Sequence, residues 1–427
     1  MAGDPGMTVT VIGCDGSALT PVASAALAGA SVVAGGQRHL VSVTVPPAAE
    51  RIVIQHLDTA LDAICAARAP AAVLASGDPG FFGIVRALRA RGVTPVVIPA
   101  VSSVALAFAR LGLDWTDALV LSAHGRAAGP VLAAALAHPK AAILTGPPEA
   151  ATGQLRSGLL AAGRTVYAAE RLGTPDERVH DLTADPAAAV SDPHVLICLD
   201  PAALDPAALD PAAPGPAAPG PMAPPSPARW LAGQQGAPAG WALPEDGFEH
   251  RDSMITKAEV RALVLARLGP GPGRTVWDVG AGSGSVAVEC ARFGAWAVAI
   301  ESDDGQCARI RRNAAAHGVR LQVVAGRAPD VLAGLPAPDA VFAGGGDDDV
   351  LAGAVKAGQP DRVVVTLASV DRVRGVTDLL TGAGYTAEGT QLQASRLAEL
   401  PGGSLRLAAV NPVFVIWAAR PRTGAAS

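Results

Sequence analysis

The sequence is poor in aromatic residues and has no excess of charge of one sign. Only 4% of its 427 residues are aromatic, and much of its apolar content is alanine. The formal net charge is −5, with no long run of either sign. This balance argues against nucleic acid as a main partner, although local basic pockets for a small anion remain allowed. A chain of this length has room for two or three domains.

The five cysteines form no CxxC pair, and their number is odd. We therefore expect neither a disulfide framework nor a zinc site, and we predict no bound metal. Unpaired thiols suit a reducing compartment, so we place the chain in the cytoplasm. The first residues lack a basic flank and a long apolar core, so we expect no signal peptide. No strongly apolar stretch reaches about 18 residues, so we expect no membrane span.

Proline is concentrated in one segment. Residues 200–227 contain ten prolines, and the sequence DPAAL occurs there twice in tandem. Proline at this density disfavours helix and sheet and favours an extended chain, which predicts a semi-rigid tether. A surface loop inside one domain is the alternative, but structureless loops of this length are rare in compact domains. We therefore predict a first domain at 1–200, a linker at 201–240 and a second domain at 241–427.

Apolar strand-like runs alternate with alanine-rich helical runs in the first half. The predicted strands include residues 8–14, 31–35, 71–76, 93–99 and 118–123, and the pattern repeats after Lys140. Such alternation predicts an α/β domain with largely parallel sheets. The second half opens on a helix, with Thr256 as its N-cap and Glu259 as a capping-box partner. A regular β-α-β-α series follows, which predicts a doubly wound sheet.

The stretch WDVGAGSGS, residues 277–285, joins a strand to a helix through alternate glycines. A dinucleotide site normally spaces its glycines as GxGxxG. The spacing here is GxGxG, with an acid two residues ahead, which is the pattern of S-adenosylmethionine (AdoMet) methyltransferase sheets. A dehydrogenase and a glycine turn in another α/β sheet are the alternatives. The cofactor-binding residues predicted in this half are Asp278, Gly280, Ala281, Gly282, Ser283, Gly284, Glu301, Gly326, Ala328 and Thr256.

These residues have distinct expected roles. The Asp278 carboxylate can lie near the sulfonium and amino end of the cofactor, where negative charge is useful. Glu301 ends the next predicted strand and can accept hydrogen bonds from ribose hydroxyls. Residues 326–328 would lie near the adenine, and residues 342–346 beside the methyl group. Three glycines at 344–346 would leave room for a bulky substrate.

The first half has glycine turns of its own after predicted strands. Gly13 and Gly16 follow the first strand, SGDPGFFG (76–83) follows a later one, and PAVSS (99–103) begins a helix. Each turn alone is explained by ordinary strand–turn–helix chemistry. Taken together they predict a second cofactor site, formed by Gly13, Gly77, Asp78, Pro79, Ser102 and Ser103.

With these motifs, and with SAHGR (122–126), the first half resembles the tetrapyrrole methylases, in the branch that methylates C5 of a precorrin. FEHRDSMITKAEVRAL (248–263) and WDVGAGSGSVAVE (277–289) are similar to the family that methylates C15 and decarboxylates the C12 acetate. The resemblance covers nearly the whole chain outside the tether. It departs from the family pattern at Cys14, Phe82 and Ala368, where a glycine, a tyrosine and an acid are expected.

The resemblance implies a tetrapyrrole-methylase fold of two αβα subdomains, followed by a Rossmann-like class I AdoMet methyltransferase domain. It implies the fused decarboxylating C5,15-methyltransferase family of corrin-ring biosynthesis, which converts precorrin-6B to precorrin-8X. One AdoMet would bind in each half, and a homo-oligomer is expected. The alternatives are an AdoMet-dependent RNA methyltransferase, and a chain in which one half only provides a binding scaffold for the other.

Methyl transfer from a sulfonium to an electron-rich carbon depends mainly on positioning, and the sequence shows no catalytic triad. A substrate with many carboxylates needs arginine, lysine and backbone N–H groups around a large groove. Arg126 and Lys257 are the first candidates for a catalytic role, because both lie inside matched motifs. The other candidates for substrate binding are Arg38, His39, His124, His250, Arg251, Arg396 and Arg406.

Overall fold

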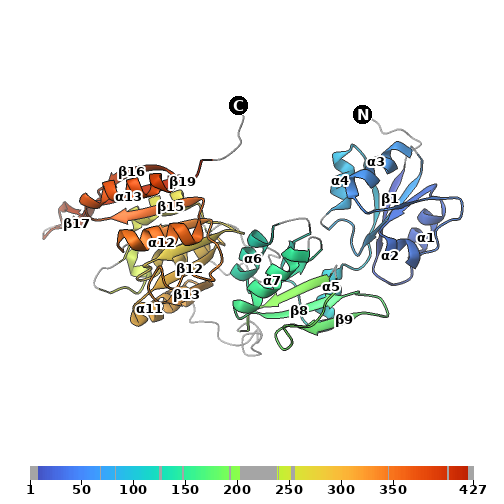
Figure 1. Ribbon diagram of the computed structural model, residues 1–427, viewed down its shortest axis with the longest axis horizontal. Helices are drawn as coiled ribbons and strands as arrows, with labels where there is room; N and C mark the ends of the chain where they lie inside the picture. The colour runs from blue at the N-terminus through green and yellow to red at the C-terminus, as the bar shows by residue number, and fades with distance from the viewer. Residues whose placement is uncertain are drawn as a thin grey trace. The chain divides into compact units, whose positions relative to one another are not determined.

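The computed structural model describes residues 8–421 except 68, 82, 125–126, 147–148, 192–193, 202–237, 239, 252–254, 345 and 402. Phe82, Arg126 and almost all of the predicted linker therefore lie outside the described residues. The chain divides into two compact units (Figure 1), one of residues 1–126, 140–156 and 163–233, and the other of 127–139, 157–162 and 234–427. In the part of the chain that is described, no helix is long and apolar enough to cross a membrane.

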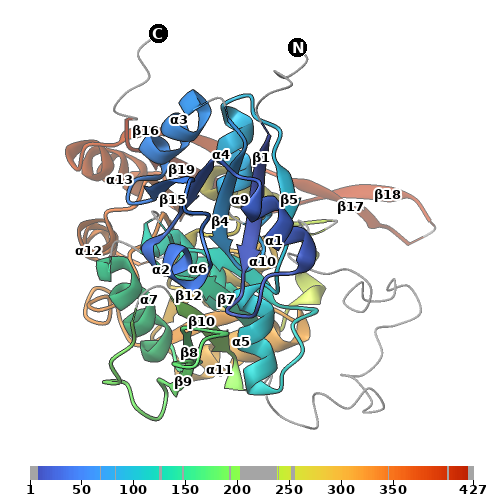
Figure 2. The same cartoon turned by 90° about the vertical axis from the view of Figure 1, so that its right-hand side faces the viewer.

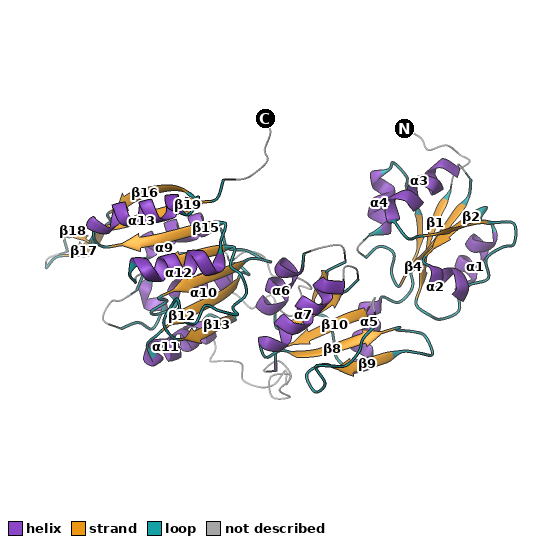
Figure 3. Ribbon diagram, viewed as in Figure 1, coloured by secondary structure: helices purple, strands orange, loops and turns teal. Residues whose placement is uncertain are grey.

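The first sheet is entirely parallel, with strand order β3-β2-β4-β1-β5. Its strands are β1 (Val9–Cys14), β2 (Val32–Gly35), β3 (Glu50–Val53), β4 (Ala71–Ser76) and β5 (Val96–Ile98). Alternate side chains of each strand point to opposite faces. Val9 and Val11 therefore pack with α3 (Leu57–Ala67) and α4 (Ile84–Ala90), whereas Ile12 packs with α1 (Pro21–Ala28) and α2 (Gln37–Ser42) (Figure 3).

The second sheet is mixed, with strand order β6-β7-β10-β8-β9. It consists of β6 (Leu119–Ser122), β7 (Lys140–Leu144), β8 (Thr165–Glu170), β9 (Arg178–Asp181) and β10 (His194–Leu199), and α5 (Ser103–Leu111) packs against it. In the sequence, α6 (Ala128–Ala137) lies between β6 and β7, and α7 (Glu149–Ala161) between β7 and β8. Only β6 and β7 pair in parallel; β10 runs antiparallel to both β7 and β8. The expectation of largely parallel sheets is therefore wrong here. All six residues of β10 are buried, and such a run gives no sign of strand direction.

The third sheet, in the second half, has strand order β13-β12-β11-β14-β15-β19-β16. β11 to β15 are parallel, and β19 runs antiparallel between β15 and β16. The doubly wound sheet is thus confirmed, but the inserted strand departs from the 3-2-1-4-5-6 order of dinucleotide-binding sheets. The strands are β11 (Thr275–Val279), β12 (Trp296–Glu301), β13 (Leu321–Ala325), β14 (Ala340–Ala343), β15 (Arg362–Leu367), β16 (Thr386–Leu392) and β19 (Val413–Ala419).

Helices cover both faces of this sheet. One face packs against α9 (Ala258–Leu268), α10 (Ser285–Arg292) and α11 (Asp304–Ala316), and the other against α12 (Asp348–Gly358) and α13 (Asp371–Gly382). Because the parallel strands end at one edge, their following loops gather there. A hairpin of β17 (Ser395–Glu399) and β18 (Leu405–Ala409) separates β16 from β19 and extends beyond the sheet (Figure 2).

The start of α9 differs from the predicted capping box. Its N-cap is Lys257, whose side chain makes no capping hydrogen bond. The Ala258 N–H instead donates to Glu245 Oε1 at 2.9 Å, from the short 3-10 helix Glu245–Gly247. Glu259 binds Arg396 through both carboxylate oxygens. The capping roles predicted for Thr256 and Glu259 are therefore wrong, because a residue more distant in the sequence satisfies the helix terminus, whereas cofactor binding by Thr256 remains a prediction.

Candidate functional site

The glycine loop after β11 has the backbone that its sequence requires. Gly280, Gly282 and Gly284 have φ of +70°, +57° and +74°, a region that side chains with a Cβ rarely adopt. A Cβ on Gly280 or Gly282 would meet no atom within 4 Å, whereas one on Gly284 would lie 2.8 Å from Ile310 Cγ2. Gly284 thus allows α10 to pack on α11, and the first two glycines leave open space beside the loop.

Asp278 lies at the end of β11, beneath this loop, and its residue is only 1% exposed. Its Oδ2 accepts the Ala287 N–H at 3.0 Å, and its Oδ1 is buried without a hydrogen-bond partner. Burial raises the pKa of the carboxyl to about 7, and the nearby Glu301 charge adds to the increase. A cation beside Asp278 would offset the cost of ionising this carboxyl. The unsatisfied oxygen therefore suits the positively charged end of AdoMet.

Glu301 holds the same loop from the end of β12. Its Oε2 accepts the Gly282 N–H at 2.8 Å, and its Oε1 accepts the N–H groups of Ser302 at 2.8 Å and Asp303 at 2.9 Å. Three backbone donors thus fix the carboxylate at the edge of the sheet. A carboxylate has about four acceptor positions, so the Glu301 group can also accept a hydroxyl hydrogen bond.

The loops after β13 and β14 reach the same edge. The Gly326 N–H donates to the Glu301 carbonyl at 2.9 Å, and Ala328 is buried. A Cβ on Gly344 would lie 3.9 Å from the Gly280 carbonyl oxygen. The predicted residues of these loops are therefore brought toward the glycine loop, while their contacts with a cofactor remain predictions.

Asn313 is a positioning residue that the sequence analysis missed. Its Nδ2 donates to the carbonyls of Glu249 at 2.9 Å and Ser283 at 2.8 Å, and its Oδ1 accepts the Glu249 N–H at 2.8 Å. One buried side chain on α11 thus fixes the FEHR segment to the glycine loop. Its position in a polar run, RRNAAA, gives no signal of this role.

The sequence surroundings of Arg261 and Glu289 likewise gave no signal that these two residues form a buried ion pair. Both side chains are 0% exposed, and Arg261 Nε lies 2.8 Å from Glu289 Oε1. Glu289 also accepts the N–H groups of Ala242 and Leu243, and Arg261 Nη1 donates to the Thr256 carbonyl at 2.5 Å. This buried pair connects both segments that precede α9 to α10, so Thr256 contributes its backbone to the framework of the site.

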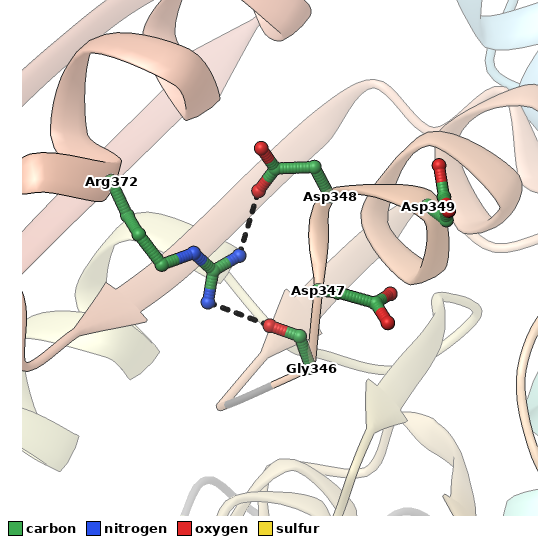
Figure 4. Close-up of a pocket in the computed structure, with 5 residues that line it drawn as sticks. All are labelled: Gly346, Asp347, Asp348, Asp349 and Arg372. Carbon is green, nitrogen blue, oxygen red and sulfur yellow. Dashed lines mark hydrogen bonds and ion pairs between the residues drawn. The ribbon is translucent and has the colours of Figure 1, made fainter.

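A shallow depression of about 570 Å³ lies where α12 and α13 begin, lined by Gly346, Asp347, Asp348, Asp349 and Arg372 (Figure 4). Arg372 donates to the Gly346 carbonyl at 2.6 Å and to Asp348 at 2.8 Å. The depression follows the ends of β14 and β15 and includes Gly346, one of the residues expected beside the methyl group. Its acidic lining would repel substrate carboxylates, so it does not by itself indicate a substrate site.

The predicted residues of the first half also meet at one strand edge. A Cβ on Gly13 would lie 2.2 Å from the Gly77 carbonyl oxygen and 2.5 Å from the Ala100 nitrogen, and one on Gly77 would lie 3.1 Å from the Ser103 nitrogen. Glycine at 13 and 77 therefore lets the loops after β1, β4 and β5 touch. Ser102 caps α5 by accepting the Val104 N–H at 3.2 Å.

The turn after β4 adds two further predicted residues. Asp78 Oδ1 accepts the Gly80 N–H at 2.8 Å, and Pro79 is buried. Cys14, where the resemblance led us to expect a glycine, ends β1, and its carbonyl accepts the Gly77 N–H at 2.8 Å. The sequence therefore located the loops correctly, whereas cofactor contacts of their residues remain predictions.

The basic residues predicted to bind substrate carboxylates differ in whether they already pair with acidic side chains of the protein. The Arg396 guanidinium forms bidentate pairs with both Glu245 and Glu259. It therefore connects the 3-10 helix to α9 and has its charge balanced within the protein. Arg251 lies 3.8 Å from Asp303, and Arg406 is exposed on β18. Lys257 is half-buried at the start of α9, and His250 Nδ1 is buried without a partner.

Comparison with known proteins adds independent information. A family described as tetrapyrrole (corrin/porphyrin) methylases matches residues 11–188, and a precorrin methyltransferase domain family matches residues 246–419. The chain is 38% identical over 372 residues to a precorrin-6Y C(5,15)-methyltransferase (decarboxylating) from Sinorhizobium, with 83% of this chain and 82% of the relative covered.

Two shorter relatives each match less than half of the chain. One is a probable cobalt-precorrin-6B C(15)-methyltransferase (decarboxylating) from Pyrobaculum calidifontis, 33% identical over 41% of this chain and 94% of its own. The other is a cobalt-precorrin-7 C(5)-methyltransferase from Salmonella typhimurium, 35% identical over 45% of this chain and 98% of its own. Separate proteins named for C5 and for C15 methylation thus both resemble parts of this chain.

Proposed function

The chain belongs to the decarboxylating precorrin-6Y C5,15-methyltransferases, which are AdoMet-dependent enzymes of cobalamin biosynthesis, and we propose that its two halves divide the reaction between them. Residues 1–200 methylate C5 of the tetrapyrrole. Residues 241–427 methylate C15 and decarboxylate the C12 acetate, and residues 201–240 connect the two domains. The substrate is precorrin-6B and the product is precorrin-8X.

The observation that carries this proposal is the presence of two glycine-loop sites on different sheets. Gly13 lies near the end of β1 and Gly77 follows β4 in a five-stranded parallel sheet, whereas Gly280–Gly284 follow β11 of a seven-stranded mixed sheet. Ligands of open α/β sheets bind outside the carboxyl ends of the strands. Each half therefore offers its own place for a cofactor, as two methylations on one chain require.

In the second half, AdoMet would supply an electrophilic methyl group on a positively charged sulfur. The Asp278 carboxylate would stabilise the positive end of the cofactor, and Glu301 would hold its ribose hydroxyls. The Gly280–Gly284 backbone allows close approach, and Asn313 keeps the loop in register with the FEHR segment. Holding donor and acceptor in line contributes most of the acceleration, because the meso carbon is already electron-rich.

At each methylated carbon, a new C–C bond forms as the carbon–sulfur bond breaks, and the carbon then loses its proton. In the decarboxylation, the bond between the acetate methylene and its carboxylate breaks. The electron pair passes into the conjugated macrocycle after a ring carbon is protonated, and CO2 leaves. The remaining methylene then takes up a proton as the ring carbon loses one, which leaves a methyl group at C12. Half-buried Lys257 would bind a substrate carboxylate near this centre.

A mass assay of the purified full chain tests the division of labour. With AdoMet and precorrin-6B, the product should gain two methyl groups and lose one CO2. Asp278→Ala should abolish C15 methylation and leave C5 methylation active. A variant that loses both methylations would contradict separate sites, and wild-type protein that leaves the tetrapyrrole mass unchanged would overturn the function. One AdoMet bound per chain, instead of two, would indicate that one half only serves as a scaffold.

Further properties belong to the same proposal. The five cysteines form no disulfide, which agrees with a cytoplasmic location. Leu397, Leu405 and Leu407 are at least 59% exposed on the β17–β18 hairpin, which supports a homo-oligomer. The family relatives are named for tetrapyrrole substrates, so we expect no nucleic-acid partner and set aside the RNA methyltransferase alternative.

A further inference from the structure

A compact group of polar side chains lies where the strands of the first sheet end, and none of its members is among the predicted cofactor-binding residues. Arg38 and His39 are carried by α2, which follows β2, and Ser76 is the last residue of β4. Arg38 Nη2 donates to Ser76 Oγ at 2.5 Å, and the same oxygen lies 3.2 Å from His39 Nε2. One hydroxyl thus joins the guanidinium to the imidazole.

The charge of Arg38 is not balanced by a neighbouring acid. Within the described residues Arg38 forms no ion pair, and its guanidinium has only the Ser76 hydroxyl as a hydrogen-bond partner. The carboxylate of Asp15, which follows Cys14, instead accepts the N–H groups of Ser17 and Val101. Arg38 is exposed at the surface, so its guanidinium is accessible to an anion that arrives from elsewhere.

The surrounding groups are neutral. Burial, together with the Arg38 charge, lowers the pKa of His39 to about 4, so the imidazole is uncharged at neutral pH. Burial and Asp15 raise the pKa of the Cys14 thiol to about 11, so this group does not supply a thiolate for Arg38. His39 Nδ1 is also buried without a hydrogen-bond partner. The group therefore has one net positive charge and additional hydrogen-bonding capacity.

The position of the group connects it to the expected site. Arg38 and His39 follow the end of β2, and Cys14 and Ser76 end the adjacent part of the sheet, where β4 lies between β2 and β1. Ser76 precedes Gly77 directly, and the Gly77 N–H is bound by the Cys14 carbonyl. A ligand seated against the Gly13 and Gly77 loops would therefore lie beside this cation.

We propose that Arg38, assisted by Ser76 and His39, binds a peripheral carboxylate of the tetrapyrrole during C5 methylation. The inference rests on the proposed function of the first half and assigns it a substrate subsite. A carboxylate has the charge and the acceptor geometry that a guanidinium and a hydroxyl recognise together. The cofactor has a carboxylate as well, so the experiment must separate the two sources.

The test compares steady-state C5 methylation by full-length wild type, Arg38→Ala, Arg38→Lys and Ser76→Ala. Arg38→Ala should raise KM for the tetrapyrrole about ten- to a hundredfold with kcat nearly unchanged, because a charge-assisted hydrogen bond is lost from substrate binding. Arg38→Lys should recover part of the loss, and Ser76→Ala should show a smaller increase. Arg89→Ala, an exposed arginine at the end of α4, is the matched control and should keep the wild-type KM.

Two accompanying measurements make the outcome decisive. C15 methylation by the same Arg38→Ala protein and its AdoMet affinity should both stay at wild-type values, which also shows that the chain is folded. An unchanged tetrapyrrole KM in Arg38→Ala would overturn the proposal. A weakened AdoMet affinity with unchanged KM would assign the carboxylate to the cofactor and also overturn it. If wild type itself does not methylate C5, the function of the first half fails instead.

Discussion

Arg261 and Glu289 form an ion pair from which solvent is excluded on both sides, with both side chains 0% exposed. Glu289→Ala should therefore destabilise the second half by about 3–5 kcal/mol, because it leaves an unpaired buried guanidinium. Urea denaturation followed by tryptophan fluorescence measures this loss, since Trp241, Trp277, Trp296 and Trp417 belong to this half.

The exposed pair of Arg374 and Asp378 is the control for that change. Its side chains are 87% and 59% exposed, and it links successive turns of α13. Asp378→Ala should leave the urea midpoint unchanged. Equal effects of the two substitutions would contradict a special role for the buried pair.

Asp278 should make AdoMet binding in the second half depend on pH. Its pKa is raised to about 7 by burial, so the carboxyl is increasingly protonated as the pH falls below this value. A positively charged ligand prefers the ionised form, so affinity should increase between pH 6 and pH 8 and then level off. Calorimetric titrations at several pH values test this, and Asp278→Asn should abolish the trend at one of the two sites while weakening binding there.

Gly282→Ala should impair the same site through its backbone. The φ of +57° costs a residue with a Cβ about 1–2 kcal/mol, and the Cβ would also enter the open space beside the loop. Both the stability of the second half and its AdoMet affinity should fall. Gly382→Ala is the control, because this exposed glycine of α13 has a helical φ and free space around it. Unchanged affinity in Gly282→Ala would place the cofactor elsewhere.

Arg396 should contribute stability that depends on acid pH. Its guanidinium lowers the pKa of Glu245 to about 2 and also lowers that of Glu259. The ionised glutamates therefore stabilise the fold above their ordinary pKa of about 4.5, and this contribution disappears as the pH falls toward 2. Arg396→Ala should lower the urea midpoint at pH 7, and the difference from wild type should shrink between pH 4.5 and pH 2. A difference independent of pH would exclude this coupling.

The local features of the site were predictable because they depend on neighbours in the sequence. Asp278 and the three glycines that follow it form a turn whose backbone dictates its residues, and Ser102 caps its own helix. The contacts that assemble the site join distant segments. Glu245 satisfies the Ala258 N–H in place of Thr256, and Arg396 finds its glutamates 137 and 151 residues earlier.

The direction of strands was equally hidden from the sequence. The apolar run of β10 fits a parallel or an antiparallel position, because burial on both faces removes the alternation that would mark an edge. Asn313 and Arg261 are of residue types that are mostly exposed in helices, whereas both are buried here with several partners. Sequence motifs locate the loops of a binding site more readily than the distant buried side chains that hold those loops in place.

In both mixed sheets the strand order delays completion of the sheet during protein synthesis. In each one, the strand that comes last in the sequence, β10 or β19, is inserted between two earlier strands. The parallel sheet of the first half can form as soon as β5 leaves the ribosome, whereas β8 and β16 must wait for a partner made after them. A nascent chain therefore exposes open strand edges until residues 194–199, and then 413–419, have emerged.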